Sequence, residues 1–164
     1  MKKLALLFGL LALAPCAARA QNVQLFGGYS YLRLDTGAEH ANLNGWEASG
    51  TLKNSWLGFT ADFSGDYGSP FGPSTSVQTF LFGPQISLPV PLISPFIHVL
   101  AGGAREKTGN FSDTTFAGAI GGGIDTRIAP LLSYRLFQVD YLATRFGGKT
   151  QNHLRVSTGL VIRF

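Results

Sequence analysis

The sequence predicts an all-β protein: one eight-stranded antiparallel up-and-down transmembrane β-barrel that occupies residues 21–164. Three observations predict this fold. Short stretches alternate apolar and polar residues with the period of two that is typical of strands. The connections between these stretches are alternately long and short. The chain is also rich in glycine (21 residues) and phenylalanine (13), and only 13% of its residues are charged, which suits a wall of strands that faces lipid.

Residues 1–20 have the pattern of a secretory signal peptide. Lys2 and Lys3 precede the apolar run of residues 4–14. The segment Ala18-Arg19-Ala20 has the small-x-small form that precedes signal-peptidase cleavage, so the mature chain is expected to begin at Gln21.

Cys16 raises the alternative of a lipoprotein, which would be cut before that cysteine. Pro15 stands where such cleavage needs a small residue, so this alternative is disfavoured. Cys16 is the only cysteine, and without the leader the mature chain has no thiol. Three of the 13 basic residues also lie in the leader, which leaves 10 against 9 acidic residues. This balance gives no support to nucleic-acid binding.

In the first half of the mature chain, the alternation is clearest around residue 50. Trp46 and Leu52 fall on one face of an extended chain, whereas Glu47 and Lys53 fall on the other. Pro84 interrupts a later stretch, where we expect a bulge or a local bend. The first four strands are expected at residues 23–34, 45–52, 56–64 and 77–87.

In the second half, the stretch 95–104 is apolar on both faces, so its alternation does not define its orientation; we expect Ile97, Val99 and Ala101 to point outward. The last four strands are expected at residues 95–104, 115–128, 133–144 and 153–164. Long polar connections follow the first, third, fifth and seventh strands. An even-stranded barrel with both termini on one side has this order of long and short connections.

Charged residues on the inward face are expected to form a structural network inside the barrel. An eight-stranded barrel has an interior just wide enough to be filled by side chains, and charges buried there need partners. Lys or Arg on the lipid face would cost roughly 2–4 kcal/mol at the bilayer midplane. The expected network has four acids and four bases: Glu47, Lys53, Asp62, Asp125, Arg127, Asp140, Arg155 and Arg163.

Several stretches resemble the OmpA/OmpX-like small outer-membrane β-barrel domain family: FGGYSYLR (26–33), FLFGPQIS (80–87), GGGIDTRI (121–128) and FQVDYLATRFGG (137–148). The closing stretch, which places Leu160, Ile162 and Phe164 on one face, is similar to the C-terminal strand of such barrels. The resemblance implies a porin-like protein of the Gram-negative outer membrane, surrounded by outer-membrane lipid. It also implies that the closing strand is the signal for the barrel assembly machinery.

Catalytic and metal-binding patterns are weak. The histidines His40, His98 and His153 have no metal-ligand spacing, so no metal is expected. His153 could be drawn with Ser157 and Asp140 as a catalytic set, but a histidine beside a structural network is the simpler interpretation. The glycine clusters match no phosphate-binding motif. We therefore expect no enzyme activity and no cofactor.

The expected role is structural, or surface interaction through the long loops, by a monomer whose extracellular partner the sequence does not identify. Tyr67, Phe71 and Phe111 are candidate contacts in those loops. One alternative is a narrow channel, which weakly paired charges in the interior would allow. Another is a soluble lipocalin-like barrel, which would point Leu154 and Leu160 into a ligand cavity.

Overall fold

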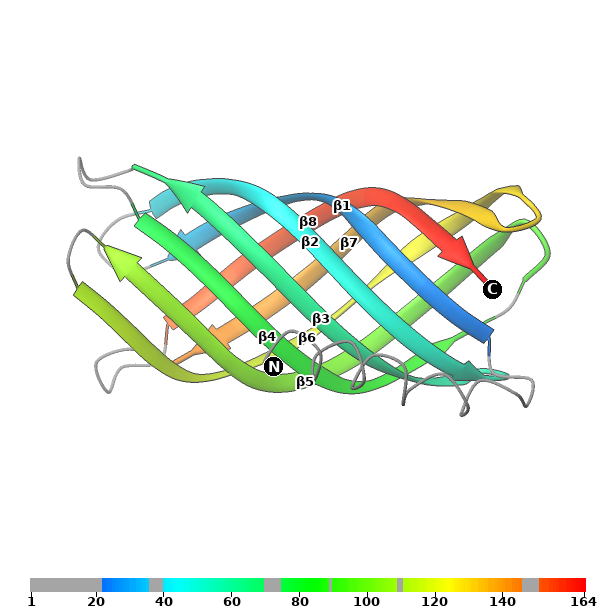
Figure 1. Ribbon diagram of the computed structural model, residues 1–164, viewed down its shortest axis with the longest axis horizontal. Coiled ribbons are helices and arrows are strands. Elements are labelled where there is room, and N and C mark those ends of the chain that lie inside the picture. Colours follow the sequence, from blue (N-terminus) through cyan, green and yellow to red (C-terminus); the bar gives the residue numbers. More distant parts are fainter. Residues whose placement is uncertain (1–21, 36–39, 70–74, 89, 109–110, 146–150) are drawn as a thin grey trace, which may run out of the picture.

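The computed structural model describes residues 22–164 apart from 36–39, 70–74, 89, 109–110 and 146–150, and the described residues form a closed eight-stranded antiparallel barrel (Figure 1). The expected leader and its cleavage site at Ala18, Ala20 and Gln21 lie outside the described residues. No helix among the described residues is long and apolar enough to cross a membrane. The strands are β1 (Asn22–Asp35), β2 (His40–Asn54), β3 (Leu57–Gly68), β4 (Thr75–Ser87), β5 (Ile93–Thr108), β6 (Phe111–Ala129), β7 (Leu132–Thr144) and β8 (Gln151–Arg163).

Each strand pairs with its neighbours in sequence, and β1 pairs with β8 to close the barrel. We call the end where β1 begins and β8 ends the terminal end; it carries the connections 55–56, 88–92 and 130–131. The opposite end, the loop end, carries the connections 36–39, 69–74, 109–110 and 145–150. The predicted strand count, antiparallel order and closure are confirmed.

The strands are longer than expected at the loop end. Residues 65–68 were expected in a loop but extend β3, where Asp66 pairs with both Gly45 and Val77. In a closed barrel every strand has a partner on both sides, so polar and glycine-rich residues continue the ladder where a local pattern predicts a turn. Tyr67 consequently lies on β3 and is exposed, while Phe71 lies outside the described residues. Phe111 is the first residue of β6.

The bulge expected at Pro84 is absent. The register between β4 and β5 is the same on both sides of Pro84, with Phe82 opposite Ala101 and Gln85 opposite His98. A proline lacks one backbone donor, and losing that donor does not require an inserted residue. The register shifts among the described strands lie instead between β6 and β7 and between β7 and β8.

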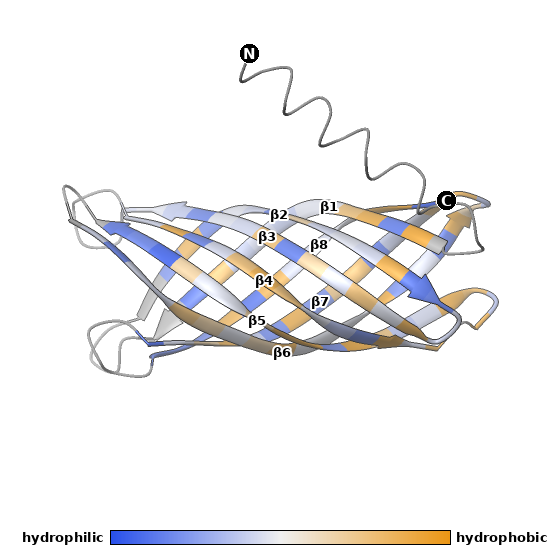
Figure 2. Ribbon diagram, turned by 60° about the horizontal axis from the view of Figure 1, so that its bottom comes forward, coloured by the Kyte–Doolittle hydropathy of each residue, from blue (hydrophilic) through white to orange (hydrophobic). Residues whose placement is uncertain are grey.

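The exposed side chains of the strands are largely apolar and many of the buried ones are polar. Figure 2 shows the corresponding changes of hydropathy along the strands. On β5, Ile97 and Val99 are 63% and 55% exposed, which confirms the expected orientation of this strand. On β8, Leu154 and Leu160 also point outward and are exposed. A lipocalin-like barrel would enclose these leucines, so the soluble alternative is wrong. An apolar outer face is the arrangement that a hydrocarbon environment requires.

This arrangement predicts a depth-dependent cost for a charge on the lipid face. Ile120, near the middle of β6, and Ile128, near its terminal end, are both outward-facing and have similar exposure, 58% and 61%. Ile120→Lys should lower the free energy of unfolding by about 2–4 kcal/mol, whereas Ile128→Lys should cost about 0–1 kcal/mol. Denaturant unfolding of the barrel in lipid vesicles, followed by tryptophan fluorescence, measures both. Equal losses in the two variants would contradict the assignment of this face to lipid.

Candidate functional site

Arg155 is the centre of the polar interior. It lies on β8, points inward and has no exposed surface. Its Nη2 atom lies 2.6 Å from Asp140 Oδ2 and 3.0 Å from Asp62 Oδ1, and its Nε atom lies 3.4 Å from Glu47 Oε2. One guanidinium therefore faces carboxylates from β2, β3 and β7. Because a buried charge is costly without partners, this cluster links strands on opposite sides of the barrel.

Further side chains bond to the carboxylate oxygens of Glu47 and Asp140. The Gln138 side-chain amide donates to Glu47 Oε1 and to Asp140 Oδ2, both at 2.7 Å. The Ser157 hydroxyl donates to Glu47, and His98 Nε2 lies 2.8 Å from Asp140 Oδ1. Gln138 and His98 were not among the expected members of the network. Both occupy inward positions on their strands, but the period alone does not reveal which inward side chains meet across the barrel.

Gly121 makes room for this cluster. A Cβ atom at this position would lie 2.0 Å from Asp140 Oδ1 and 2.4 Å from the Val139 carbonyl oxygen. A larger residue would therefore displace the carboxylate that pairs with Arg155. Glycine at this point of the wall permits close approach between β6 and β7, as expected for the glycine clusters.

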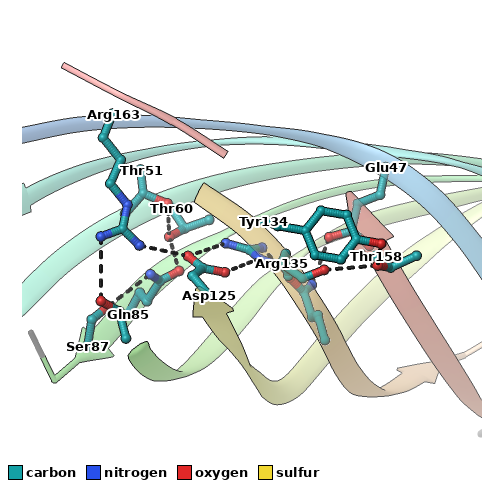
Figure 3. Close-up of polar contacts among 12 residues, drawn as sticks. Glu47, Thr51, Thr60, Gln85, Ser87, Asp125, Tyr134, Arg135, Thr158 and Arg163 are labelled. Atoms are coloured by element: carbon teal, nitrogen blue, oxygen red, sulfur yellow. Dashed lines mark hydrogen bonds and ion pairs between the residues drawn. The ribbon is translucent and has the colours of Figure 1, made fainter. Parts of the chain in front are cut away.

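A second charged cluster lies nearer the terminal end (Figure 3). Arg135 Nε lies 2.8 Å from Asp125 Oδ1, and Arg163 Nη2 lies 3.2 Å from Asp125 Oδ2. The Arg135 guanidinium also lies over the rings of Phe26 and Phe96, at 4.2 and 4.3 Å from their centroids. These contacts stabilise a buried guanidinium through both charge pairing and cation–π interaction.

A chain of hydrogen bonds between uncharged side chains lies beside the second cluster and connects β2, β3 and β4 (Figure 3). The hydroxyl oxygens of Thr51 and Thr60 are 2.9 Å apart, and Thr60 donates to Gln85 at 3.0 Å. Gln85 in turn donates to Ser87 at 3.1 Å. The polar side chains on this part of the inner face therefore bond to one another.

The alternation missed Arg135, which lies in the interior, whereas the expected network member Arg127 is exposed at the terminal end beside Lys53 and Arg163. No ion pair of the described residues includes Arg127. The register shift between Ile124 and Asp125 leaves the extra residue on β7, and the next shift leaves Ile128 unpaired on β6, beyond Arg127. On β7 a shift between Arg135 and Gln138 leaves two consecutive side chains outward and turns Arg135 inward. A bulge reverses the alternation, and the period of two does not predict its location.

The other expected network members occupy different depths. Lys53 is buried, and Arg163 is partly buried at the terminal end. Asp66, which the sequence analysis placed in a loop, is fully buried on β3 and accepts a hydrogen bond from Ser64 at 3.3 Å. The three residues of the expected assembly signal, Leu160, Ile162 and Phe164, are exposed on the outer face.

Toward the loop end, the interior contains a buried apolar cluster beside buried polar residues such as Asp66 and His153. Leu81, which pairs with Asp62 across the ladder, belongs to this cluster, as does Leu100. The side chains of the cluster come from six of the eight strands. The buried apolar cluster consists of Leu32, Leu43, Val77, Leu81, Leu100, Ala104, Ala117, Ala119 and Leu142. Paired charges and this apolar cluster both occupy space inside the barrel that a channel would need to keep open.

The arrangement provides no catalytic set from the residues considered. Ser157 donates to Glu47, and Asp140 pairs with Arg155 and His98. His153 Nε2 lies 3.0 Å from the Thr144 hydroxyl oxygen. Within the described part of the chain, no group of three or more His, Cys, Asp or Glu residues could hold a metal ion.

A closed barrel of eight antiparallel strands, apolar outside and filled with paired polar groups inside, defines the class of small transmembrane β-barrels. No family model matches the sequence, and no curated protein matches it. Comparison with solved structures shows that the chain has the fold of the OmpA/OmpX-like small outer-membrane barrels.

Three solved structures illustrate the likeness. Neisserial surface protein A is 11% identical, with a TM-score of 0.70 over 87% of this chain and 97% of that chain. Ail of Yersinia pestis, solved with the heparin analogue sucrose octasulfate, is 14% identical, with a TM-score of 0.66 over 88% and 99%. The N-terminal β-barrel domain of Pseudomonas aeruginosa OprF is 12% identical, with a TM-score of 0.54 over 87% and 97%. At these identities the likeness establishes the fold alone.

The Arg155 cluster predicts a large effect of removing its single cation. Arg155→Met leaves three buried carboxylates without that partner, so the free energy of unfolding should fall by about 3–5 kcal/mol. Arg145→Met, at an exposed position, should change it by less than about 0.5 kcal/mol. Denaturant unfolding in lipid vesicles measures both variants. Adding Glu47→Gln to Arg155→Met should recover part of the loss; equal effects of the two arginine substitutions would contradict the network.

Proposed function

We propose that the protein is a non-catalytic barrel of a bacterial outer membrane that acts as a structural element or through surface interaction at its loop end. The filled interior carries this proposal. Arg155 and its three carboxylates occupy the middle of the barrel, and a layer of buried leucines lies toward the loop end. Conduction would require breaking buried ion pairs and moving packed side chains, which favours a role at the ends of the barrel over transport.

The likeness to small outer-membrane barrels supports the proposed location, with the terminal end on the periplasmic side and the loop end outside the cell. In this orientation the exposed apolar belt lies in lipid. The barrel assembly machinery would recognise the closing strand through Leu160, Ile162 and Phe164, which face outward.

Cations at the loop end favour a polyanionic partner. Arg33 lies near the end of β1, and Arg105 and Lys107 lie near the end of β5, all exposed on the outer side of the wall. Arg145 follows directly after β7 and is also exposed. Exposed arginines and lysines in one zone suit the sulfate or carboxylate groups of an anionic polysaccharide. The structure of Ail with a heparin analogue is compatible with this partner class, but the proposal rests on the four cations of this chain.

The proposed class of protein predicts the outcome of two linked measurements. The full chain, expressed with its leader, should enter the outer-membrane fraction and migrate differently on an SDS gel before and after boiling. In planar bilayers the folded protein should give no discrete current steps, with a large porin as the positive control. Stable conductance would favour the channel alternative, and recovery in the soluble periplasmic extract would contradict the membrane location.

The loop-end cations predict salt-dependent binding to heparin. The double variant Arg105→Gln/Lys107→Gln should bind heparin beads at least about tenfold more weakly at low salt, because two adjacent charges are lost. The matched control Lys53→Gln/Arg127→Gln removes the same charge from the terminal end; on intact cells, where the proposed orientation keeps the terminal end in the periplasm and away from heparin, it should bind as the native protein does. If the control lost as much binding, net charge rather than the loop end would explain the interaction.

A further inference from the structure

The terminal end of the barrel contains a pocket of about 270 Å³ between the β2–β3 and β6–β7 connections. Lys53, Arg127 and Arg163 contribute cationic groups to its lining, and Leu131 and Phe164 contribute apolar surface. This pocket is separate from the Arg155 cluster, and the proposed role at the loop end does not use it.

The charges around this pocket are unbalanced. Arg163 Nη2 lies 3.2 Å from Asp125 Oδ2, and Nη1 lies 3.5 Å from Ser94 Oγ. The buried Nε–H of Arg163 has no hydrogen-bond partner among the described residues. Asp125 also pairs with Arg135 at 2.8 Å. One carboxylate therefore serves two guanidinium groups, and the buried Nε–H donor of Arg163 is left without an acceptor among the described residues.

Lys53 and Arg127 increase this imbalance. Lys53 is only 6% exposed, yet no hydrogen bond or ion pair holds its ammonium group within the described part of the chain. Arg127 likewise has no ion pair among those residues. Both side chains therefore add positive charge to the lining of the pocket with no salt bridge among the described residues. Even if a carboxylate on Phe164 is counted with Asp125, the four cations exceed the acids by two charges.

We propose that this pocket binds a phosphate group between Lys53, Arg127 and Arg163. A phosphate monoester carries close to two negative charges and three acceptor oxygens. It would therefore offset the excess charge and offer an acceptor to each of the three cations. Guanidinium groups match phosphate oxygens in geometry, and an ammonium group adds a compact charge.

The phosphate group has two possible sources, a lipid headgroup and free phosphate. Leu131 and Phe164 are 60% and 65% exposed beside the cations. A lipid phosphate in the pocket would place its acyl chains against this apolar rim, whereas free phosphate would leave the rim uncovered. The chemistry of the three cations is the same in both cases.

The test uses the full mature barrel, folded in maltoside micelles in phosphate-free buffer, and follows the Arg163 Nε–H resonance in ¹H–¹⁵N spectra. Arg163→Lys identifies this resonance by its loss. The probes are phosphatidic acid, diacylglycerol with the same acyl chains, and inorganic phosphate. We expect a saturable shift with phosphatidic acid and none with diacylglycerol. A similar shift with inorganic phosphate would identify free phosphate as a sufficient source, and its absence would identify lipid.

Two charge-matched variants determine whether the site is specific. Lys53→Gln/Arg127→Gln should weaken the apparent affinity at least tenfold, whereas Arg33→Gln/Arg145→Gln, at the loop end, should leave it unchanged. If the first variant lacks the heat-induced gel shift of a folded barrel, Arg127→Gln alone provides the test, with at least threefold weakening expected. No shift with either phosphate probe, or equal weakening in variants at the two ends, would overturn the proposal.

Discussion

Lipid offers no hydrogen-bond partners, so every backbone N–H and C=O group in the membrane must pair within the protein. The rest of this structure depends on that constraint. It forces β1 to pair with β8 and so abolishes the sheet edges. Closure with eight strands leaves a narrow interior, and the inward side chains must fill it. The same constraint places Ile97, Val99 and Ile120 outside and leaves the inner face for polar groups.

A narrow interior in turn determines how charge is arranged. Water has little space there, so Arg155 obtains its partners from Glu47, Asp62 and Asp140 on three other strands. The three carboxylates meet Arg155 inside the barrel, and Gly121 leaves space for the carboxylate of Asp140. Such a cluster makes the strand register more specific, because shifting a strand by one residue would turn a buried charged side chain outward, toward the lipid. The interior thus stabilises the wall and the register of its strands.

The alternation of apolar and polar residues was sufficient to predict the strand number, the order and most inward positions, because the lipid face penalises every exception. The alternation did not predict those positions at which the neighbouring strand determines the direction of a side chain or the length of a strand. The β7 bulge turned Arg135 inward, and no local pattern marks its position. The extension of β3 to Asp66 depends on neighbours that are distant in sequence. Contacts across the barrel, such as Gln138 with Glu47, have no local signature at all.

The two ends of the interior differ in a way that these constraints explain. Toward the loop end, Leu32, Leu43 and Leu142 pack together, and burial of apolar surface needs no further partner. Toward the terminal end, Arg127 lies exposed at the rim, while Asp125 pairs with both Arg135 and Arg163. The β7 bulge that turns Arg135 inward therefore gives the single carboxylate of Asp125 a second guanidinium to balance. The irregularity that breaks the alternation is thus also a source of the uneven charge at this end of the barrel.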